Sequence, residues 1–174
     1  MRKKRLLQLT AALLCAVILS ACGGAPADAD YTCTVSISCA TILDNMDQCA
    51  ESKKELVPAD GVILPPTEVA FAEGESASDV LQRVCRDNGI HLESKFTPVY
   101  NSAYIQGIHN IYEFDVGKLS GWMYAVNDWF PNYGCSLYQV QDGDVIRWVY
   151  TCDLGADVGG GQAAGDGQQE GAST

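Results

Sequence analysis

The segment 121–155 constrains the fold more than any other part of the chain, because it gathers aromatic residues between turn signals. All three tryptophans lie within it: Trp122, Trp129 and Trp148. Asp-Gly pairs favour turns, and aromatic and β-branched residues favour strands. The pattern therefore predicts a strand at 122–127, an aromatic turn, a turn at Asp142 and Gly143, and a strand at 145–151.

The N-terminus has the composition of an export signal. Residues 2–5 are all basic, and residues 6–19 are apolar except for Gln8 and Thr10. This apolar stretch is short for a membrane-spanning helix and fits a signal peptide. Its end, Leu-Ser-Ala-Cys at 19–22, resembles a bacterial lipobox. We therefore expect a signal peptide at 1–21 and lipidation of Cys22 at the extracytoplasmic face of the cell membrane. The alternative is an ordinary signal peptide.

The charge of the chain excludes one class of partner. Of its 11 basic residues, four lie in the signal segment, which holds none of the 22 acidic ones, so the remainder has a formal charge of −15. A chain this acidic is poorly suited to nucleic acid or to an anionic lipid surface. We expect contact with the membrane only through the lipid anchor.

Six cysteines follow Cys22: Cys33, Cys39, Cys49, Cys85, Cys135 and Cys152. In an exported chain they suggest at least one disulfide bond, although anaerobic bacteria also export reduced cysteines. No pair has CxxC spacing and the chain has only two histidines, so we predict no metal site.

The first strand and the only clear helix are well marked. Residues 31–39 alternate without a break between a Tyr/Cys/Val/Ile face and a Thr/Ser face, which predicts a half-buried strand. Ser76 followed by Asp79 predicts the start of a helix, and Gly89 its end. Short strand-like segments follow at 91–96, 104–108 and 112–114, before the two already described.

This order predicts an α+β fold, a small β-grasp-like domain with one helix packed on a mixed β-sheet. We expect the lipidated cysteine and a tether at 22–30, the folded domain at 31–158, and a disordered Gly-rich tail at 159–174. Only one domain fits in this length.

Sequence motifs for catalysis are missing. There is no nucleophile elbow, no His-Glu-x-x-His and no phosphate loop. We expect no enzymatic activity. A thiol-active surface protein is a minor alternative, which would require an accessible thiolate with a lowered pKa.

The aromatic cluster is the candidate binding site. It consists of five side chains within twelve residues: Trp122, Tyr124, Trp129, Phe130 and Tyr133. The last three lie at or beyond a turn, where large apolar side chains are expected to be partly exposed, and exposed aromatic patches often mark binding surfaces. Trp122 and Tyr124 could equally close a small core.

Three motifs resemble the transcobalamin-like C-terminal domain of bacterial surface proteins: FAEGESASDVL at 71–81, GWMYAVN at 121–127 and DGDVI at 142–146. In the animal cobalamin carriers, the similar domain closes over a corrin ring bound on a larger helical domain. The resemblance implies that the five aromatic residues face a ring, with cobalamin as a possible ligand and no required cofactor.

We expect this chain to depart from the carriers by lacking the helical domain. Half of the known pocket would then be missing unless a separate protein completes it, and a shared fold module does not establish a shared ligand. The alternative is a cell-envelope interaction or adhesion module, in which the aromatic patch binds a protein or a polymer without any small-molecule ligand.

Overall fold

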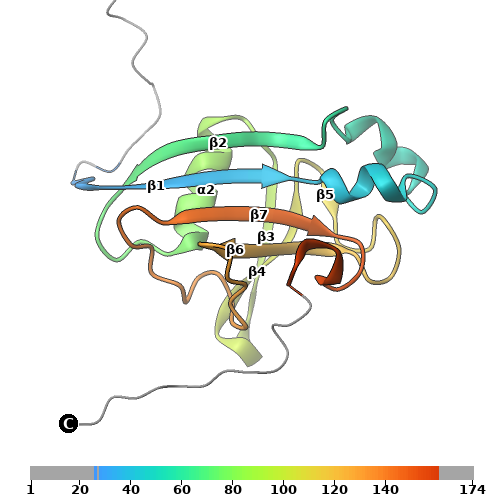
Figure 1. Ribbon diagram of the computed structural model, residues 1–174. Coiled ribbons are helices and arrows are strands. Elements are labelled where there is room, and N and C mark those ends of the chain that lie inside the picture. Colours follow the sequence, from blue (N-terminus) through green and yellow to red (C-terminus); the bar gives the residue numbers. More distant parts are fainter. Residues whose placement is uncertain (1–25, 27, 161–174) are drawn as a thin grey trace, which may run out of the picture.

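The computed structural model describes residue 26 and residues 28–160. A mixed four-stranded sheet forms its centre, in the order β2 (Val62–Phe71), β1 (Tyr31–Ser38), β7 (Val145–Thr151), β6 (Gly121–Val126) (Figure 1). β1 and β7 are parallel, and the other neighbours are antiparallel. The prediction of an α+β fold with a mixed sheet is confirmed.

The alternation of residues 31–39 sets the two faces of β1. Cys33, Val35 and Ile37 are buried, whereas the Thr and Ser side chains between them are partly or fully exposed. The residues on either side of Pro65 and Pro66 form one strand, β2, with register shifts opposite β1. Prolines cannot donate to a ladder, which suits β2 to the edge of the sheet.

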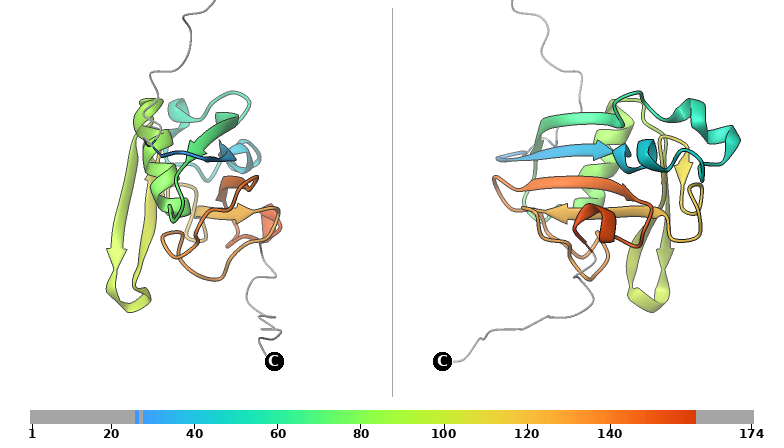
Figure 2. Two further views of the ribbon diagram at one scale, coloured as in Figure 1. Left: turned by 90° about the vertical axis from the view of Figure 1, so that its left-hand side faces the viewer. Right: turned by 45° about the vertical axis from the view of Figure 1, so that its right-hand side comes forward.

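The helix α2 (Ala77–Asp87) covers the buried face of this sheet (Figure 2). Its N-terminus is a capping box, because the Ser76 hydroxyl accepts from the Asp79 N–H and the Asp79 carboxylate accepts from the Ser76 N–H. On the helix, the buried Arg83 pairs with Glu75 and donates to the Ala70 carbonyl at 2.8 Å. These contacts fasten the helix to β2.

A second, antiparallel sheet lies on the same side as the helix. It consists of β3 (Leu92–Thr97), β4 (Ser102–Ile108) and β5 (Ile111–Tyr112). The β3–β4 hairpin extends past the body of the domain (Figure 2), and the short 3-10 helix η3 (Pro98–Tyr100) forms its tip. The strand predicted at 112–114 ends at Tyr112, since Phe114 adopts a left-handed backbone conformation, with φ of 67°.

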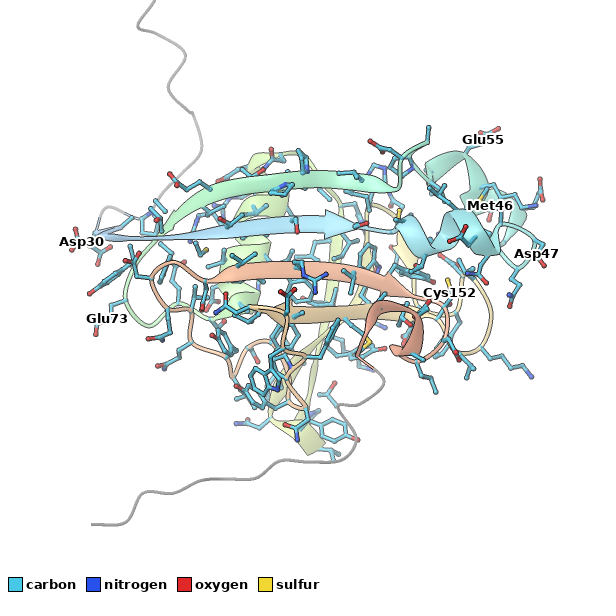
Figure 3. The ribbon with its side chains drawn as sticks, in the orientation of Figure 1. Asp30, Met46, Asp47, Glu55, Glu73 and Cys152 are labelled. Atoms are coloured by element: carbon cyan, nitrogen blue, oxygen red, sulfur yellow. The ribbon has the colours of Figure 1, made fainter. Side chains whose placement is uncertain are left out.

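Three further 3-10 helices complete the described chain. η1 (Ala40–Asn45) and η2 (Glu51–Leu56) follow β1, and η4 (Ala156–Val158) follows β7. Exposed acidic side chains lie at both ends of the sheet, with Asp30 and Glu73 at one end and Asp47 and Glu55 at the other (Figure 3). No helix in the described ranges is long and apolar enough to cross a membrane.

The expected disulfide is not present. All six cysteines from Cys33 to Cys152 are free, and all but Cys152 are buried. Cys33, Cys85 and Cys135 lie on β1, on α2 and in the loop before β7, where they fill space in the core as small apolar side chains. The signal segment, Cys22 and nearly all of the Gly-rich tail lie outside the described residues.

Candidate functional site

A groove opens between the β3–β4 hairpin and the segment 131–137 of the loop that joins β6 to β7. Its outer part is a cavity of about 520 Å³. No charged side chain lines it, and three tyrosines do: Tyr100, Tyr104 and Tyr133. Ligand pockets commonly have volumes of about 300–1,000 Å³ and a mainly apolar lining. The outer cavity has the size and the chemistry of a ligand site.

An inner cavity of about 190 Å³ continues the groove toward the core. Both cavities share the wall residues Ala103, Tyr104, Pro131, Tyr133 and Gly134. The inner cavity also reaches three core aromatics, namely Trp122, Tyr124 and Trp148. An apolar group that enters the groove would therefore contact the edge of the aromatic core.

Close packing of the hairpin against the loop forms the floor of the groove. The Ser136 hydroxyl lies 2.9 Å from the Ser102 hydroxyl and accepts from the Ala103 N–H at 2.9 Å. A Cβ at Gly134 would lie 1.7 Å from the Ser102 Oγ, so only glycine allows this approach. The two walls are therefore held at a fixed separation.

A buried carboxylate orders the rest of the loop. Asp144 accepts hydrogen bonds from the Tyr138 hydroxyl and the Asn127 side-chain amide, each at 2.8 Å, and from the Gln141 N–H at 2.9 Å. Asn127 and Asp128 have φ values of 50° and 66°, and form a tight turn closed by paired hydrogen bonds between Val126 and Trp129. This turn places Trp129 and Tyr133 beside the groove.

Trp122 and Tyr124 belong to the core, as the alternative interpretation of the sequence allowed. Their exposed fractions are 7% and 8%. The Trp122 indole donates to the Ile111 carbonyl at 2.8 Å and meets Tyr150 edge to face, and Tyr124 stacks on Trp148 at 5.5 Å. Burial raises the pKa of Tyr124 far above its ordinary value. At most one edge of each ring is available to a ligand.

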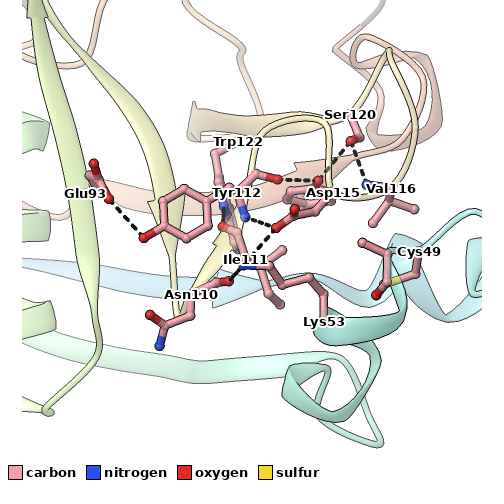
Figure 4. Close-up of polar contacts among 12 residues, drawn as sticks. Cys49, Lys53, Glu93, Asn110, Ile111, Tyr112, Asp115, Val116, Ser120 and Trp122 are labelled. Carbon is pink, nitrogen blue, oxygen red and sulfur yellow. Dashed lines mark hydrogen bonds and ion pairs between the residues drawn. The ribbon is translucent and has the colours of Figure 1, made fainter.

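The segment that receives the Trp122 hydrogen bond is itself anchored (Figure 4). Asp115 accepts from the Tyr112 N–H at 2.7 Å and pairs with Lys53 at 3.4 Å, while the Lys53 ammonium also lies over the Tyr112 ring. The Ser120 hydroxyl accepts from the Val116 N–H at 3.1 Å. These contacts hold β5 in place and give Trp122 a structural function.

The expectation that Phe130 is exposed is wrong. Its exposed fraction is 6%, and it lines neither cavity. The chain after η4 returns to this region, and a Cβ at Gly160 would lie within 3.1 Å of the Phe130 ring and 3.0 Å of Met123. This contact could not be predicted from the sequence, because Gly160 lies in a segment that has no large apolar residue.

Trp129 and Tyr133 are exposed as expected, with exposed fractions of 52% and 39%. Their rings meet at 6.0 Å. Tyr133 lines both cavities, whereas Trp129 lies next to it outside the groove. Of the five predicted residues, Tyr133 has the most direct access to a ligand.

The opposite wall, which the hairpin forms, was not predicted from the sequence. Tyr100 and Tyr104 line the outer cavity from this side and Leu137 lines it from the loop, and all three are exposed. Burial and a hydrogen bond to Glu113 raise the pKa of Tyr104 to about 12, so its hydroxyl remains protonated at neutral pH. The sequence signal that predicted the exposure of Trp129 is a large apolar residue at a turn. The same signal is present at Val99 and Tyr100, which lie between β3 and β4.

The described residues hold no cluster suited to a metal ion or to thiol chemistry. No group of three His, Cys, Asp or Glu side chains is placed to hold a metal within the described ranges. Burial raises the pKa values of Cys33, Cys39 and Cys85 to about 12, which disfavours the reactive thiolate.

Comparisons with known proteins agree with the fold. Residues 74–152 match the model of a domain of unknown function, DUF4430. The crystal structure of haptocorrin in complex with Cbi has a similar fold, with a TM-score of 0.52 and 12% identity over 71% of this chain. The chain spans 25% of the haptocorrin chain. No curated protein matches.

A second solved structure is that of a candidate metal-binding protein from Ruminococcus gnavus ATCC 29149. It has 14% identity, and the match covers 70% of this chain and 97% of that one. Its TM-score of 0.41 is too low to establish a common fold. The comparisons thus support a transcobalamin-like fold for this domain and leave its ligand to the chemistry of the site.

Proposed function

We propose that this protein is a non-catalytic, membrane-anchored extracytoplasmic lipoprotein that binds a corrinoid in the groove between the β3–β4 hairpin and the loop 131–137. The observation that carries the proposal is the uncharged, tyrosine-lined cavity of about 520 Å³, which continues to the aromatic core. Large, flat ligands depend on extensive apolar contact, and this lining provides it. The similarity to haptocorrin, whose structure holds Cbi, supports the same ligand class.

The groove, between its two side walls, would cover only one face of a corrin ring. Binding energy depends on how much apolar surface is covered and on how well both walls are preorganised. We therefore expect modest affinity for residues 23–174 alone, and a second protein surface that completes the pocket. This second surface would occupy the position that the rest of the chain occupies in haptocorrin, of which the present chain matches a quarter.

The test is a fluorescence titration of residues 23–174 with cyanocobalamin and cobinamide, corrected for inner-filter absorption. Trp129 is the natural reporter, because it is exposed and its ring lies 6.0 Å from that of Tyr133, while Trp122 and Trp148 are buried. We expect saturable quenching at micromolar concentrations. A flat corrected titration would overturn the proposal.

Tyr133→Ala should weaken corrinoid binding on the order of ten-fold, because it removes an aromatic wall shared by both cavities. The matched control is Tyr31→Ala, whose exposed fraction of 38% nearly equals the 39% of Tyr133. Tyr31 lies outside the groove. Equal losses in the two variants would mean that quenching does not report on the groove.

An interaction module is the second candidate function, because the hairpin tip exposes more apolar surface than a groove ligand needs. Val99 is 86% exposed and lines neither cavity. A protein or polymer partner would contact it, whereas a corrinoid in the groove would not. Val99→Ser should leave corrinoid binding unchanged, and a loss of envelope partners in crosslinking with this variant would favour the second candidate.

The anchor needs its own test. Metabolic labelling with a radioactive fatty acid should mark the full-length protein, and Cys22→Ser should abolish the label and release the protein from the membrane fraction. Retention of the label in Cys22→Ser would contradict the assignment of Cys22.

A further inference from the structure

The free edge of β3 is the most exposed stretch of regular structure in the domain. β3 pairs with β4 on one side only, and four consecutive residues, 93–96, are exposed. No backbone hydrogen bond joins Leu92–Thr97 to any other described segment besides β4. Such an edge presents unpaired N–H and C=O groups and can accept another strand.

The direction of those groups follows from two hydrogen bonds, one on each side of a register shift between Glu93 and Ser94. The His91 carbonyl accepts from the His109 N–H at 2.8 Å, so the backbone groups of residue 91 point toward the β4 side. Beyond the shift, the Ala103 N–H, opposite Phe96, donates to the Ser136 hydroxyl at 2.9 Å and not to β3. Because successive residues of a strand point their N–H and C=O groups to opposite edges, the backbone groups of Leu92, Ser94 and Phe96 point to the free edge, centred on Ser94.

The side chains along this edge are self-complementary. In an antiparallel pair of two β3 strands centred on Ser94, Glu93 of one copy lies opposite Lys95 of the other, and the reverse pair forms by symmetry. The same register places Leu92 opposite Phe96, twice. Opposite charges and apolar pairs directly across an antiparallel ladder are the combinations that stabilise it. Any other register centred on this edge would lose at least one of these matches.

We propose that β3 is a homodimerisation edge, at which two copies of this chain pair antiparallel about Ser94 to form a continuous six-stranded sheet. Phe96, with an exposed fraction of 58%, would be covered by Leu92 of the second copy. Lys95, for which no ion-pair partner exists within the described ranges, would gain one. The two-fold axis of this pair lies between the two β3 strands, and it gives the closed, isologous contact that is typical of dimers.

The proposed dimer interface lies next to the groove, but the dimer does not require a ligand in the groove. Thr97, at the end of β3, lines the outer cavity, so the paired edge reaches the rim of the groove. The interface is small compared with stable dimers, which bury about 1,600 Å² in total. We therefore expect reversible association at high micromolar concentration, strengthened where chains share a surface.

Variants in which a charge is reversed test the proposed dimer. The association of residues 23–174 is measured by sedimentation velocity across a concentration series up to about 0.5 mM. The unchanged protein should show a monomer–dimer equilibrium. Lys95→Glu places like charges opposite each other at both pairs and should weaken association on the order of ten-fold or more. Glu93→Lys should do the same, although it also removes the hydrogen bond from the Tyr112 hydroxyl to Glu93.

Two combinations identify the register. The double exchange Glu93→Lys with Lys95→Glu restores opposite charges in the homodimer, and a mixture of the two single variants should form a heterodimer. The control is Lys118→Glu, an equal change of charge at an exposed site away from β3. A monomer at all concentrations, or single variants that associate like the control, would overturn the proposal. Failure of the double exchange to restore association would overturn the register.

Discussion

Two neighbouring groups of aromatic residues differ in how far their side chains are exposed to solvent and in what they contact. The core group consists of Trp122, Tyr124, Trp148 and Tyr150, all with exposed fractions of 8% or less. The rim group consists of Tyr100, Tyr104, Trp129 and Tyr133, all with exposed fractions of 39% or more. The first group packs between the sheets, and the second borders the groove.

The contrast shows that burial, and not residue type, separates the structural aromatic residues from the candidate binding residues. In the core, the Tyr150 hydroxyl donates to the Tyr112 carbonyl at 2.7 Å and lies 2.9 Å from the Ser120 hydroxyl, so its polar atom is satisfied internally. In the rim, the ring faces remain open to solvent, which costs free energy unless a ligand or partner covers them. The same residue types therefore hold the fold together in one place and offer a binding surface in the other.

The largest effect should come from truncating the core group. Trp122→Ala removes a buried ring and leaves the Ile111 carbonyl without its donor, so it should lower the free energy of unfolding by about 3–5 kcal/mol. Trp129→Ala, in the rim, should change it by less than about 0.5 kcal/mol. Urea denaturation followed by circular dichroism measures both. Similar losses in the two variants would remove the distinction between core and rim.

Alkaline pH should lower the stability of the core. Burial raises the pKa values of Cys33, Cys39 and Cys85 to about 12, above an ordinary value of 9.0. Below pH 9 these thiols are neutral in both states, so their contribution to stability is complete. As the pH rises from 9 toward 12, only the unfolded state releases the protons, and the free energy of unfolding falls.

At pH 10 this loss should be on the order of 1 kcal/mol for each thiol. The measurement is urea denaturation at pH 7.5, 9 and 10, with thiol labelling of the native protein as a control. Labelling should be slow for the five buried cysteines and faster for Cys152, which is half-buried. Constant stability between pH 9 and pH 10 would contradict the burial of these thiols.

The sequence predicted the fold well because its local signals agree with the tertiary contacts. The unbroken alternation of β1, and the Ser76 and Asp79 pair that begins α2, both correspond to what the structure contains. Patterns within one segment could not reveal that β3 and β4 form a separate sheet. The left-handed residues His109 and Asn110 turn the chain between β4 and β5, so that β5 extends this second sheet.

The site was only partly predictable for the same reason. The segment 122–133 was recognised because its aromatic residues are close in sequence, but a groove needs two walls. Tyr100 and Tyr104 come from a hairpin that meets the loop only through long-range contacts such as that of Ser102 with Ser136. The burial of Phe130 likewise depends on Gly160, thirty residues later. Contacts of this kind have no local signature.

The smallest effect tests the link between core and rim. The Tyr124 hydroxyl donates to the Tyr133 carbonyl at 3.0 Å, and so joins a core ring to the backbone of the groove wall. Tyr124→Phe should lower the free energy of unfolding by about 1 kcal/mol, the net contribution of one hydrogen bond. It should also weaken corrinoid binding about two- to three-fold, because the groove wall loses one of the contacts that hold it in place.

Tyr138→Phe is the matched control, because it removes a hydroxyl that bonds to Asp144 at 2.8 Å from a tyrosine that lines neither cavity. Both variants should lose similar stability in urea denaturation, and only Tyr124→Phe should affect the titration. If both weaken binding equally, the wall depends on the order of the whole loop. If neither does, Tyr133 is positioned by its own packing against Trp129, and the rim is independent of the core.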